Sequence, residues 1–337
     1  ASPAVNVQIL SDGSVLMVWQ DSADQIKAAR VAPGASTFGT TENVSAVNDG
    51  SGLKLWAGRN GQAAVAWFKK GTNTIVTSLR PTPTSTFGAA QTIPRNLTDD
   101  TNLSNYEIAI GDDGRMAFAS QARNGPGGNK IKVWLRPKDG VWDSGQIVST
   151  GTGNSFDFPK IGIDGTGRTV VAWQNTLTNL SNSGHVVQVT ERGPGGTDLW
   201  QPPATLSEPS TYQEVPSLAV ASDGTAGITW NYGDGQPLAF GEPGVSYLTA
   251  FLTQVSWRTA TGAWTPPDTV SDRSGVNLNP VATAGNESVV VGWLQRTLFS
   301  APYQAGLAAS GPATIPSATL TVNSTGDRAA TNASQGC

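Results

Sequence analysis

Two ten-residue stretches, "SDGSVLMVWQ" at residues 11–20 and "SDGTAGITWN" at residues 222–231, share a turn, a run to a tryptophan and a final amide side chain. The same spacing of six residues from the turn recurs at roughly fifty-residue intervals along the chain. The pairs that follow it are Gly13 and Trp19, Gly61 and Trp67, Gly114 and Ser120, Gly167 and Trp173, Gly224 and Trp230, and Glu287 and Trp293. Self-similarity at such a period indicates a repeat protein.

Each repeat begins with a predicted β-hairpin. Apolar residues stand eight, six and four positions before the turn, as in Tyr106, Ile108 and Ile110, and this period of two is typical of a strand. Asp-Gly or Asn-Gly at the turn suits the positive φ of a two-residue hairpin loop. The strand after the turn, for example "QAAVAW", is apolar at nearly every position, so we expect it to be buried on both faces.

A third and a fourth strand complete the repeat. The third strand reaches an arginine, and a turn aromatic and a short fourth strand such as "GQIVS" or "PDTVS" follow. The arginines are Arg30, Arg80, Arg136, Arg192 and Arg258, and we expect structural roles for them because they recur at equivalent positions. Four antiparallel strands repeated six times predict an all-β fold, a six-bladed β-propeller of four-stranded antiparallel blades.

The predicted propeller spans residues 1–323, and a polar C-terminal tail spans 324–337. The predicted blades cover about 5–48, 52–100, 105–150, 157–208, 215–272 and 278–323. Because the first strand begins at Val5 and the last ends near Asn323, blades 1 and 6 are each expected to consist of contiguous sequence.

Composition restricts the function classes. Charged residues make up 14% of the chain and the net charge is −4, with no run of Lys and Arg that could follow a nucleic acid backbone, so no nucleic acid partner is expected. The apolar runs are far shorter than the ~20 residues of a membrane-spanning helix. The one cysteine, Cys337, and the one histidine, His185, do not make a zinc site. We expect a secreted or cell-surface protein, since the chain begins "ASPAVN" without methionine.

The hairpin followed by "RTATGAWTPPDTVS" and its equivalents resembles a repeat of secreted bacterial β-propeller proteins, over roughly residues 5–323. At the level of architecture the chain also resembles, distantly, six-bladed sialidase-like and fucose-lectin-like propellers. The sialidase Asp-box places its tryptophan three residues after the glycine, whereas the spacing here is six. No Arg-Ile-Pro stands near the start, so no catalytic residue is carried over from that family.

The connections between second and third strands lengthen along the chain, up to "YGDGQPLAFGEPGVSY" at residues 232–247. Long irregular loops on a rigid scaffold commonly carry recognition, so we expect the working face there. The first hypothesis is a noncatalytic propeller that binds a glycan or another surface ligand through this loop-rich face. The predicted ligand-binding residues are Tyr212, Tyr232, Phe240, Tyr247, Arg273 and Tyr303.

Two alternatives remain open. One is a polysaccharide-degrading glycoside hydrolase or lyase with acidic residues at the channel mouth, for which Asp157, Glu214 and Asp234 are the candidate catalytic carboxylates. The other is a structural scaffold that binds protein, suggested by the polar tail and its terminal thiol. No cofactor and no metal site is expected, although the acidic segment "LTDDTN" at residues 97–102 leaves calcium open. His185 begins a predicted strand, and two readings of it stay open: a general base, or a simply exposed residue.

Overall fold

The computed structural model describes residues 5–72, 74–95, 103–123, 128–150, 155–177, 184–194, 199–210, 216–237, 249–272, 276–285, 287–296, 304–310 and 318–320. The predicted tail and the segment 97–102 lie outside these residues. The chain divides into two compact units, Ala1–Trp173 with Val189–Ala204, and Gln174–Gln188 with Thr205–Cys337.

Six sheets of four strands each follow one another along the chain. The first sheet holds β1 (Val5–Ile9), β2 (Val15–Gln20), β3 (Ile26–Val31) and β4 (Glu42–Asn43). The second holds β5 (Gly50–Ala57), β6 (Ala63–Lys69), β7 (Thr74–Arg80) and β8 (Gln91–Thr92). The third holds β9 (Leu103–Ile110), β10 (Met116–Arg123), β11 (Asn129–Arg136) and β12 (Gln146–Ile147).

The later sheets repeat this pattern. The fourth holds β13 (Ser155–Ile163), β14 (Thr169–Leu177), β15 (Gly184–Arg192) and β16 (Ala204–Thr205). The fifth holds β17 (Ser217–Val220), β18 (Ala226–Pro237), β19 (Thr249–Arg258) and β20 (Asp268–Thr269). The sixth holds β21 (Val276–Gly285), β22 (Ser288–Arg296), β23 (Gln304–Ser310) and β24 (Ala318–Leu320).

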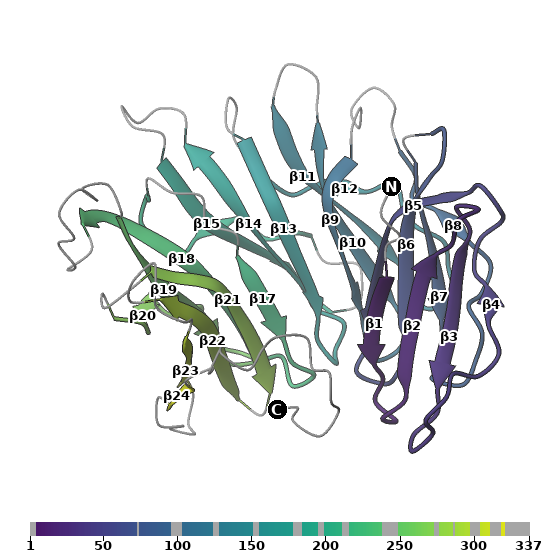
Figure 1. Cartoon of the computed structure of the whole chain (residues 1–337). Coiled ribbons are helices and arrows are strands. Elements are labelled where there is room, and N and C mark those ends of the chain that lie inside the picture. The colour runs from purple at the N-terminus through teal and green to yellow at the C-terminus, as the bar shows by residue number, and fades with distance from the viewer. Residues whose placement is uncertain are drawn as a thin grey trace. The chain divides into compact units, whose positions relative to one another are not determined.

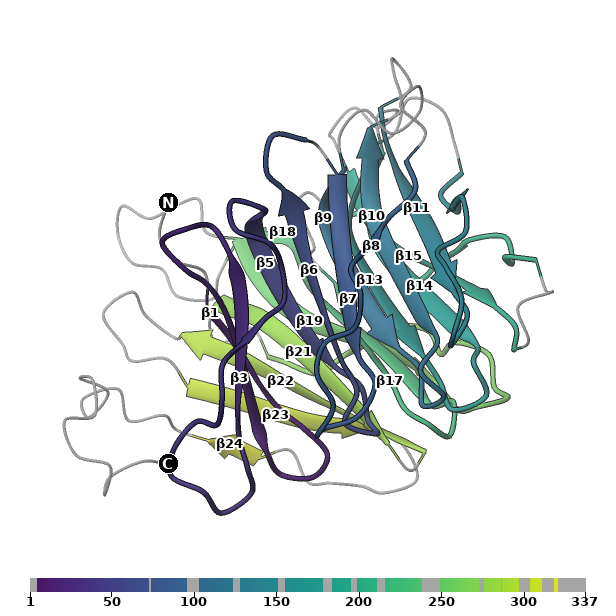
Figure 2. The same cartoon turned by 90° about the vertical axis from the view of Figure 1, so that its right-hand side faces the viewer.

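The strands of each sheet pair in chain order, and pairs such as β1–β2, β6–β7 and β18–β19 are antiparallel. This confirms the predicted fold class, an all-β fold of six four-stranded antiparallel blades. The first and sixth blades are each built from contiguous sequence, as expected. In Figure 1 the β1–β2 turn lies at the lower end of the first blade and the β2–β3 connection at its upper end, and Figure 2 shows the same strands from the side.

The hairpin turns differ from the sequence prediction. The N–H of Leu10 donates to the carbonyl of Ser14 at 2.8 Å, and Gly13 donates to Leu10 at 2.9 Å, so three residues form the loop rather than two. Gly13 has a φ of 79°, and a three-residue hairpin loop requires one residue in this left-handed region. The prediction was wrong because Asp-Gly suits both loop lengths.

Repeat tryptophans fill the layers between neighbouring blades. Trp67 is fully buried and packs in one cluster with Leu16 and Ile26 of the first blade. Trp173 is likewise buried, against Val133 of the third blade. The second strands β6, β10 and β14 are buried on both faces, as predicted, and Ala63 to Trp67 have no exposed surface. In β2 buried and half-buried residues alternate, so the prediction was wrong for this strand. Trp19 differs, because it stays partly exposed.

We call the first strand of each blade the inner strand. Several inner strands contain a residue with a positive φ, nine residues before the turn glycine in the second to fourth blades and eight residues before Glu287 in the sixth. Gly52, Asn105, Phe158 and Asn279 have φ values of 63°, 45°, 54° and 49°. In β5, β9 and β21 the pairing register shifts at this point, which marks a β-bulge. Bulges change the direction of neighbouring side chains, and here they do so in the N-terminal half of each of these strands.

Candidate functional site

The inner strands carry a row of polar residues seven positions before each turn glycine. Its members are Asn6, Lys54, Glu107, Lys160 and Ser217, in β1, β5, β9, β13 and β17. Successive side chains of a strand point to opposite faces, so Lys54 lies on the other face of β5 from the buried Leu53 and Leu55. The three charged members stand in consecutive blades of the first unit.

Glu107 is held between an ammonium group and an indole. Its Oε2 lies 3.4 Å from Nζ of Lys160, and its Oε1 accepts a hydrogen bond from Nε1 of Trp56. The side chains of Lys160 and Glu107 are 34% and 24% exposed. A ligand can therefore reach both charges, and we call Lys54, Trp56, Tyr106, Glu107 and Lys160 the inner-strand cluster.

Lys54 is half-buried. Its ammonium group donates to the carbonyl oxygen of Tyr106 at 2.9 Å and lies 4.5 Å from the centre of the Tyr106 ring. Burial lowers the pKa of Lys54; the positive charge of Lys160 adds to this effect, and the carboxylate of Glu107 opposes it. The neutral amine is thus more populated than in an exposed lysine.

Tyr106 has a supporting role in this cluster. Its hydroxyl donates to the carbonyl of Gly52 at 2.8 Å, and its ring stacks on Phe118 at 5.5 Å. Burial and the nearby Glu107 raise the pKa of Tyr106 well above its usual range, so the phenol stays protonated. It fixes Lys54 and does not act as a base.

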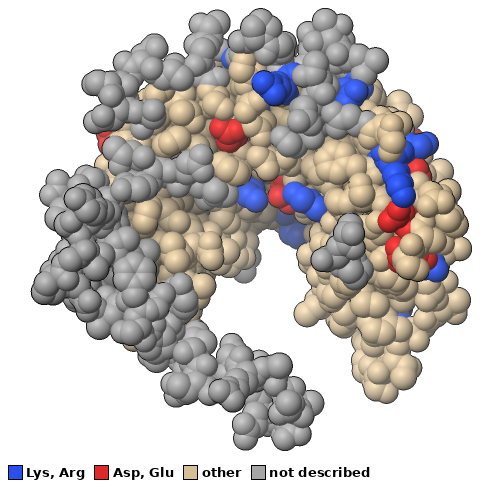
Figure 3. Space-filling view, turned by 45° about the horizontal axis from the view of Figure 1, so that its top comes forward, with Lys and Arg blue, Asp and Glu red and all other residues tan. Residues whose placement is uncertain are grey.

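Charges of both signs are also mixed elsewhere on the molecule. Figure 3, which brings the upper end of Figure 1 forward, shows Lys and Arg beside Asp and Glu in several places.

Among the described residues, no group of three or more His, Cys, Asp or Glu side chains could hold a metal ion. No helix among them is long and apolar enough to cross a membrane.

Asp157, one of the predicted carboxylates, lies in β13 among uncharged polar groups. It accepts hydrogen bonds from Gln121, from Ser155 Oγ at 2.9 Å and from Asn129 Nδ2 at 3.4 Å. The left-handed Phe158 follows it directly. The structure thus places Asp157 in an amide and hydroxyl network between the third and fourth blades.

The other predicted site residues fall mostly outside the described part of the chain. Tyr232 lies in β18, paired with Leu252 of β19. Asp234 belongs to the same strand, but its side chain is outside the description. Outside the described residues lie Glu214, Tyr212, Phe240, Tyr247, Arg273 and Tyr303. Their roles stay predictions.

His185 is the second residue of β15 and is 9% exposed, so it is buried and the reading of it as a simply exposed residue is wrong. Its Nδ1 lies 3.1 Å from both Gln174 Nε2 and Thr176 Oγ1. Its backbone pairs with that of Ser210. These contacts hold the imidazole within the polar interior of the second unit.

Three of the five repeat arginines make contacts of a structural kind. Arg30 forms an ion pair with Asp12 at 2.7 Å, and Arg80 pairs with Glu42 of the preceding blade at 2.6 Å. Arg258 donates to the carbonyl of Gly224 at 3.0 Å. Each contact fastens the end of a third strand to a turn or to a neighbouring blade.

No family model and no curated protein matches the chain. Similar solved structures include the polysaccharide lyase Uly1, with 10% identity, a TM-score of 0.56 and coverage of 93% of this chain and 80% of that one. Another is an ulvan lyase of polysaccharide lyase family PL25, with 9% identity, a TM-score of 0.51 and coverage of 92% and 82%. A third is the α-L-arabinanase of Penicillium chrysogenum, with 12% identity, a TM-score of 0.48 and coverage of 91% and 92%.

At this identity the two lyase structures show a shared propeller fold. The finer resemblance to sialidase-like and fucose-lectin-like propellers stays a prediction.

Proposed function

We propose that the chain degrades an acidic polysaccharide by β-elimination at the inner-strand cluster. The observation that carries this proposal is the pair of lysines, Lys54 and Lys160, on either side of Glu107. One lysine is exposed enough to bind a ligand and the other has a lowered pKa. The two similar structures that are named polysaccharide lyases support this reading over binding alone.

Each side chain has a distinct role in this mechanism. The ammonium group of Lys160 pairs with the carboxylate of a uronate unit and makes the hydrogen α to that carboxylate more acidic. The neutral amine of Lys54 takes this proton. The electron pair of the C–H bond forms a carbon–carbon double bond, the C–O bond to the leaving sugar breaks, and water protonates the leaving oxygen. Glu107 orients Lys160, and the ring of Trp56 offers an apolar face to the sugar.

Elimination suits this cluster better than hydrolysis. Most glycosidases use two carboxyl groups on either side of the bond that breaks. Within the described residues the inner-strand cluster holds one carboxyl group, that of Glu107. Because polysaccharides of this kind are extracellular, the proposal includes secretion.

Incubation of the protein with a panel of acidic polysaccharides, followed by the ultraviolet absorbance of unsaturated uronate, tests the proposal. We expect Lys54→Arg, which keeps the charge but supplies no base, to lower kcat about a hundredfold. Lys160→Met should both raise KM and lower kcat, because Lys160 binds the uronate carboxylate and acidifies its α hydrogen. The matched control is Lys69→Met, because Lys69 lies on β6 with a side chain that is 52% exposed.

Saturable polysaccharide binding without any unsaturated product would overturn the proposal in favour of the noncatalytic glycan binder. Equal activity of Lys54→Arg and the wild type would remove Lys54 as the base.

A further inference from the structure

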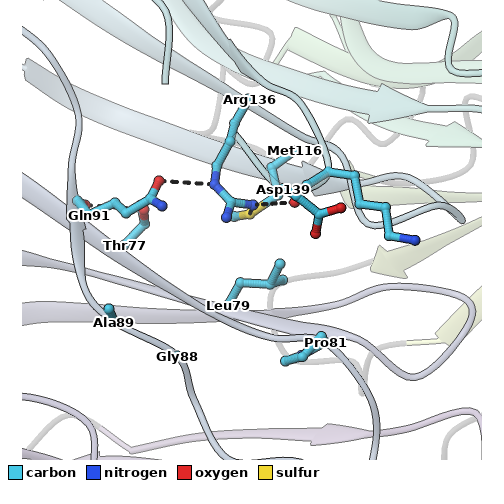
Figure 4. A pocket seen from close by; sticks show the side chains of 10 residues that line it. Thr77, Leu79, Pro81, Gly88, Ala89, Gln91, Met116, Arg136 and Asp139 are labelled. Carbon is cyan, nitrogen blue, oxygen red and sulfur yellow. Dashed lines mark hydrogen bonds between the residues drawn. The ribbon is translucent and has the colours of Figure 1, made fainter. Parts of the chain in front are cut away.

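A cavity of about 250 Å³ lies between the second and third blades, at the end that carries the β9–β10 turn. Figure 4 shows Arg136 projecting into it from the end of β11, opposite Leu79, with Gln91 and Thr77 on one side and Asp139 on the other. Cavities for drug-sized ligands measure about 300–1,000 Å³. This cavity therefore suits a smaller molecule, about the size of one sugar unit.

The hydrogen bonds of Arg136 all go to uncharged acceptors among the described residues. Its Nε donates to Gln91 Oε1 at 2.9 Å, and its Nη1 donates to the carbonyl of Lys138 at 3.3 Å and lies 3.7 Å from the sulfur of Met116. The guanidinium is always positively charged in proteins. In this cavity it thus presents a cation without a carboxylate in direct contact.

The equivalent arginine of the second blade, Arg80, has a carboxylate partner that Arg136 lacks among the described residues. Arg80 ends β7 as Arg136 ends β11, and it pairs with Glu42, the first residue of β4 in the preceding blade. The equivalent first residue of β8 is Gln91, which Arg136 contacts. An amide therefore replaces the internal carboxylate at this blade boundary. Asp139 of the lining attracts Arg136 electrostatically, but no hydrogen bond or ion pair among the described residues joins Arg136 to a carboxylate.

We propose that this cavity binds small carboxylates, with Arg136 as the main contact. Lys138 at the rim adds a second positive charge and Asp139 one negative charge, so the lining carries one net positive charge. Arg and carboxylate groups form strong charge-assisted hydrogen bonds. Leu79, Pro81 and Met116 form an apolar wall for the carbon skeleton. The proposal does not depend on the inner-strand cluster, which lies on other residues.

Isothermal titration of the intact protein with glucuronate, acetate and glucose tests the proposal. Glucuronate is expected to bind saturably, and glucose, which lacks the carboxylate, at least tenfold more weakly. Acetate shows whether the bound carboxylate belongs to a uronate sugar or to a free organic acid. Tighter binding of glucuronate than of acetate points to a uronate sugar, and equal binding points to a free organic acid.

The deciding variant is Gln91→Glu, which installs the carboxylate that Glu42 supplies to Arg80. It should weaken glucuronate binding at least tenfold without loss of thermal stability. Asn43→Asp is the matched control, since it adds the same charge on an exposed outer-strand residue of the first blade and should leave binding unchanged. Ala89→Trp, at an exposed lining position, should block the cavity without touching Arg136.

The absence of saturable binding, equal binding of glucose and glucuronate, or unchanged affinity in Gln91→Glu would each overturn the proposal. Lyase activity should persist in Gln91→Glu, so a failure here is distinguishable from a failure of the inner-strand mechanism.

Discussion

Asp12 illustrates at the scale of one residue how the repeated turn is held. Its Oδ1 accepts from the hydroxyl of Ser14 at 2.6 Å and from the backbone N–H of Ser14 at 2.9 Å, and its Oδ2 pairs with Arg30 at 2.7 Å. These bonds, the Ser14 hydroxyl first, lower the pKa of Asp12 from 3.8 to about 2, although desolvation of the carboxylate opposes them.

Because the folded-state pKa is depressed, Asp12 stabilises the fold above pH 3.8, and this contribution is lost as the pH falls toward about 2. An NMR titration should give the Asp12 carboxyl a midpoint near pH 2. Ser14→Ala should move that midpoint up toward 3.8, because it removes the strongest of these hydrogen bonds. An unchanged midpoint in Ser14→Ala would show that the hydroxyl does not set the pKa.

The positive φ of Phe158 in β13 is the first test at the scale of an element. A bulky residue such as Phe158 rarely adopts a φ of 54°, and the left-handed region costs an L-residue roughly 1–2 kcal/mol. Asn105 and Asn279 occupy bulges of other blades, and asparagine tolerates this region well. Phe158→Asn should therefore raise the unfolding free energy by about 1 kcal/mol in urea titration.

Phe38→Asn is the matched control for Phe158→Asn, because Phe38 is 47% exposed and has no left-handed backbone; its stability should barely change. A loss of stability in Phe158→Asn would mean that the contacts of the ring outweigh the backbone strain.

Packing between the fifth and sixth blades gives a second test at this scale. A Cβ at Gly227 in β18 would lie 2.3 Å from Cγ1 of Val289 in β22, which is fully buried. Gly227→Ala should destabilise the fold by about 1–3 kcal/mol, since a well-packed core cannot accept the methyl group. At Gly285 in β21 nothing lies within 4 Å, so thermal denaturation of Gly285→Ala should match the wild type. Equal melting temperatures for both variants would contradict this packing.

The sequence predicted the elements well because their apolar positions alternate in phase with one turn in every repeat. The inner-strand cluster could not be found this way, since the prediction followed the apolar positions and the residue between them changes type from Lys54 to Glu107 to Lys160. Glu107 and Lys160 lie 53 residues apart, and only the stacking of blades brings them together. A comparison of the repeats at the seventh position before each turn would have revealed this row of polar residues.

At the scale of the whole molecule, the central claim is that this propeller catalyses β-elimination with side chains from the inner strands of the second, third and fourth blades. The measurement that tests it most directly is mass spectrometry of the polysaccharide fragments formed in water enriched in heavy oxygen. Elimination predicts fragments with a new double bond and no heavy oxygen at the broken bond, and Lys160→Met should form them more slowly even at saturating polysaccharide. Fragments that carry heavy oxygen at the broken bond, or no fragments from any acidic polysaccharide, would contradict the account.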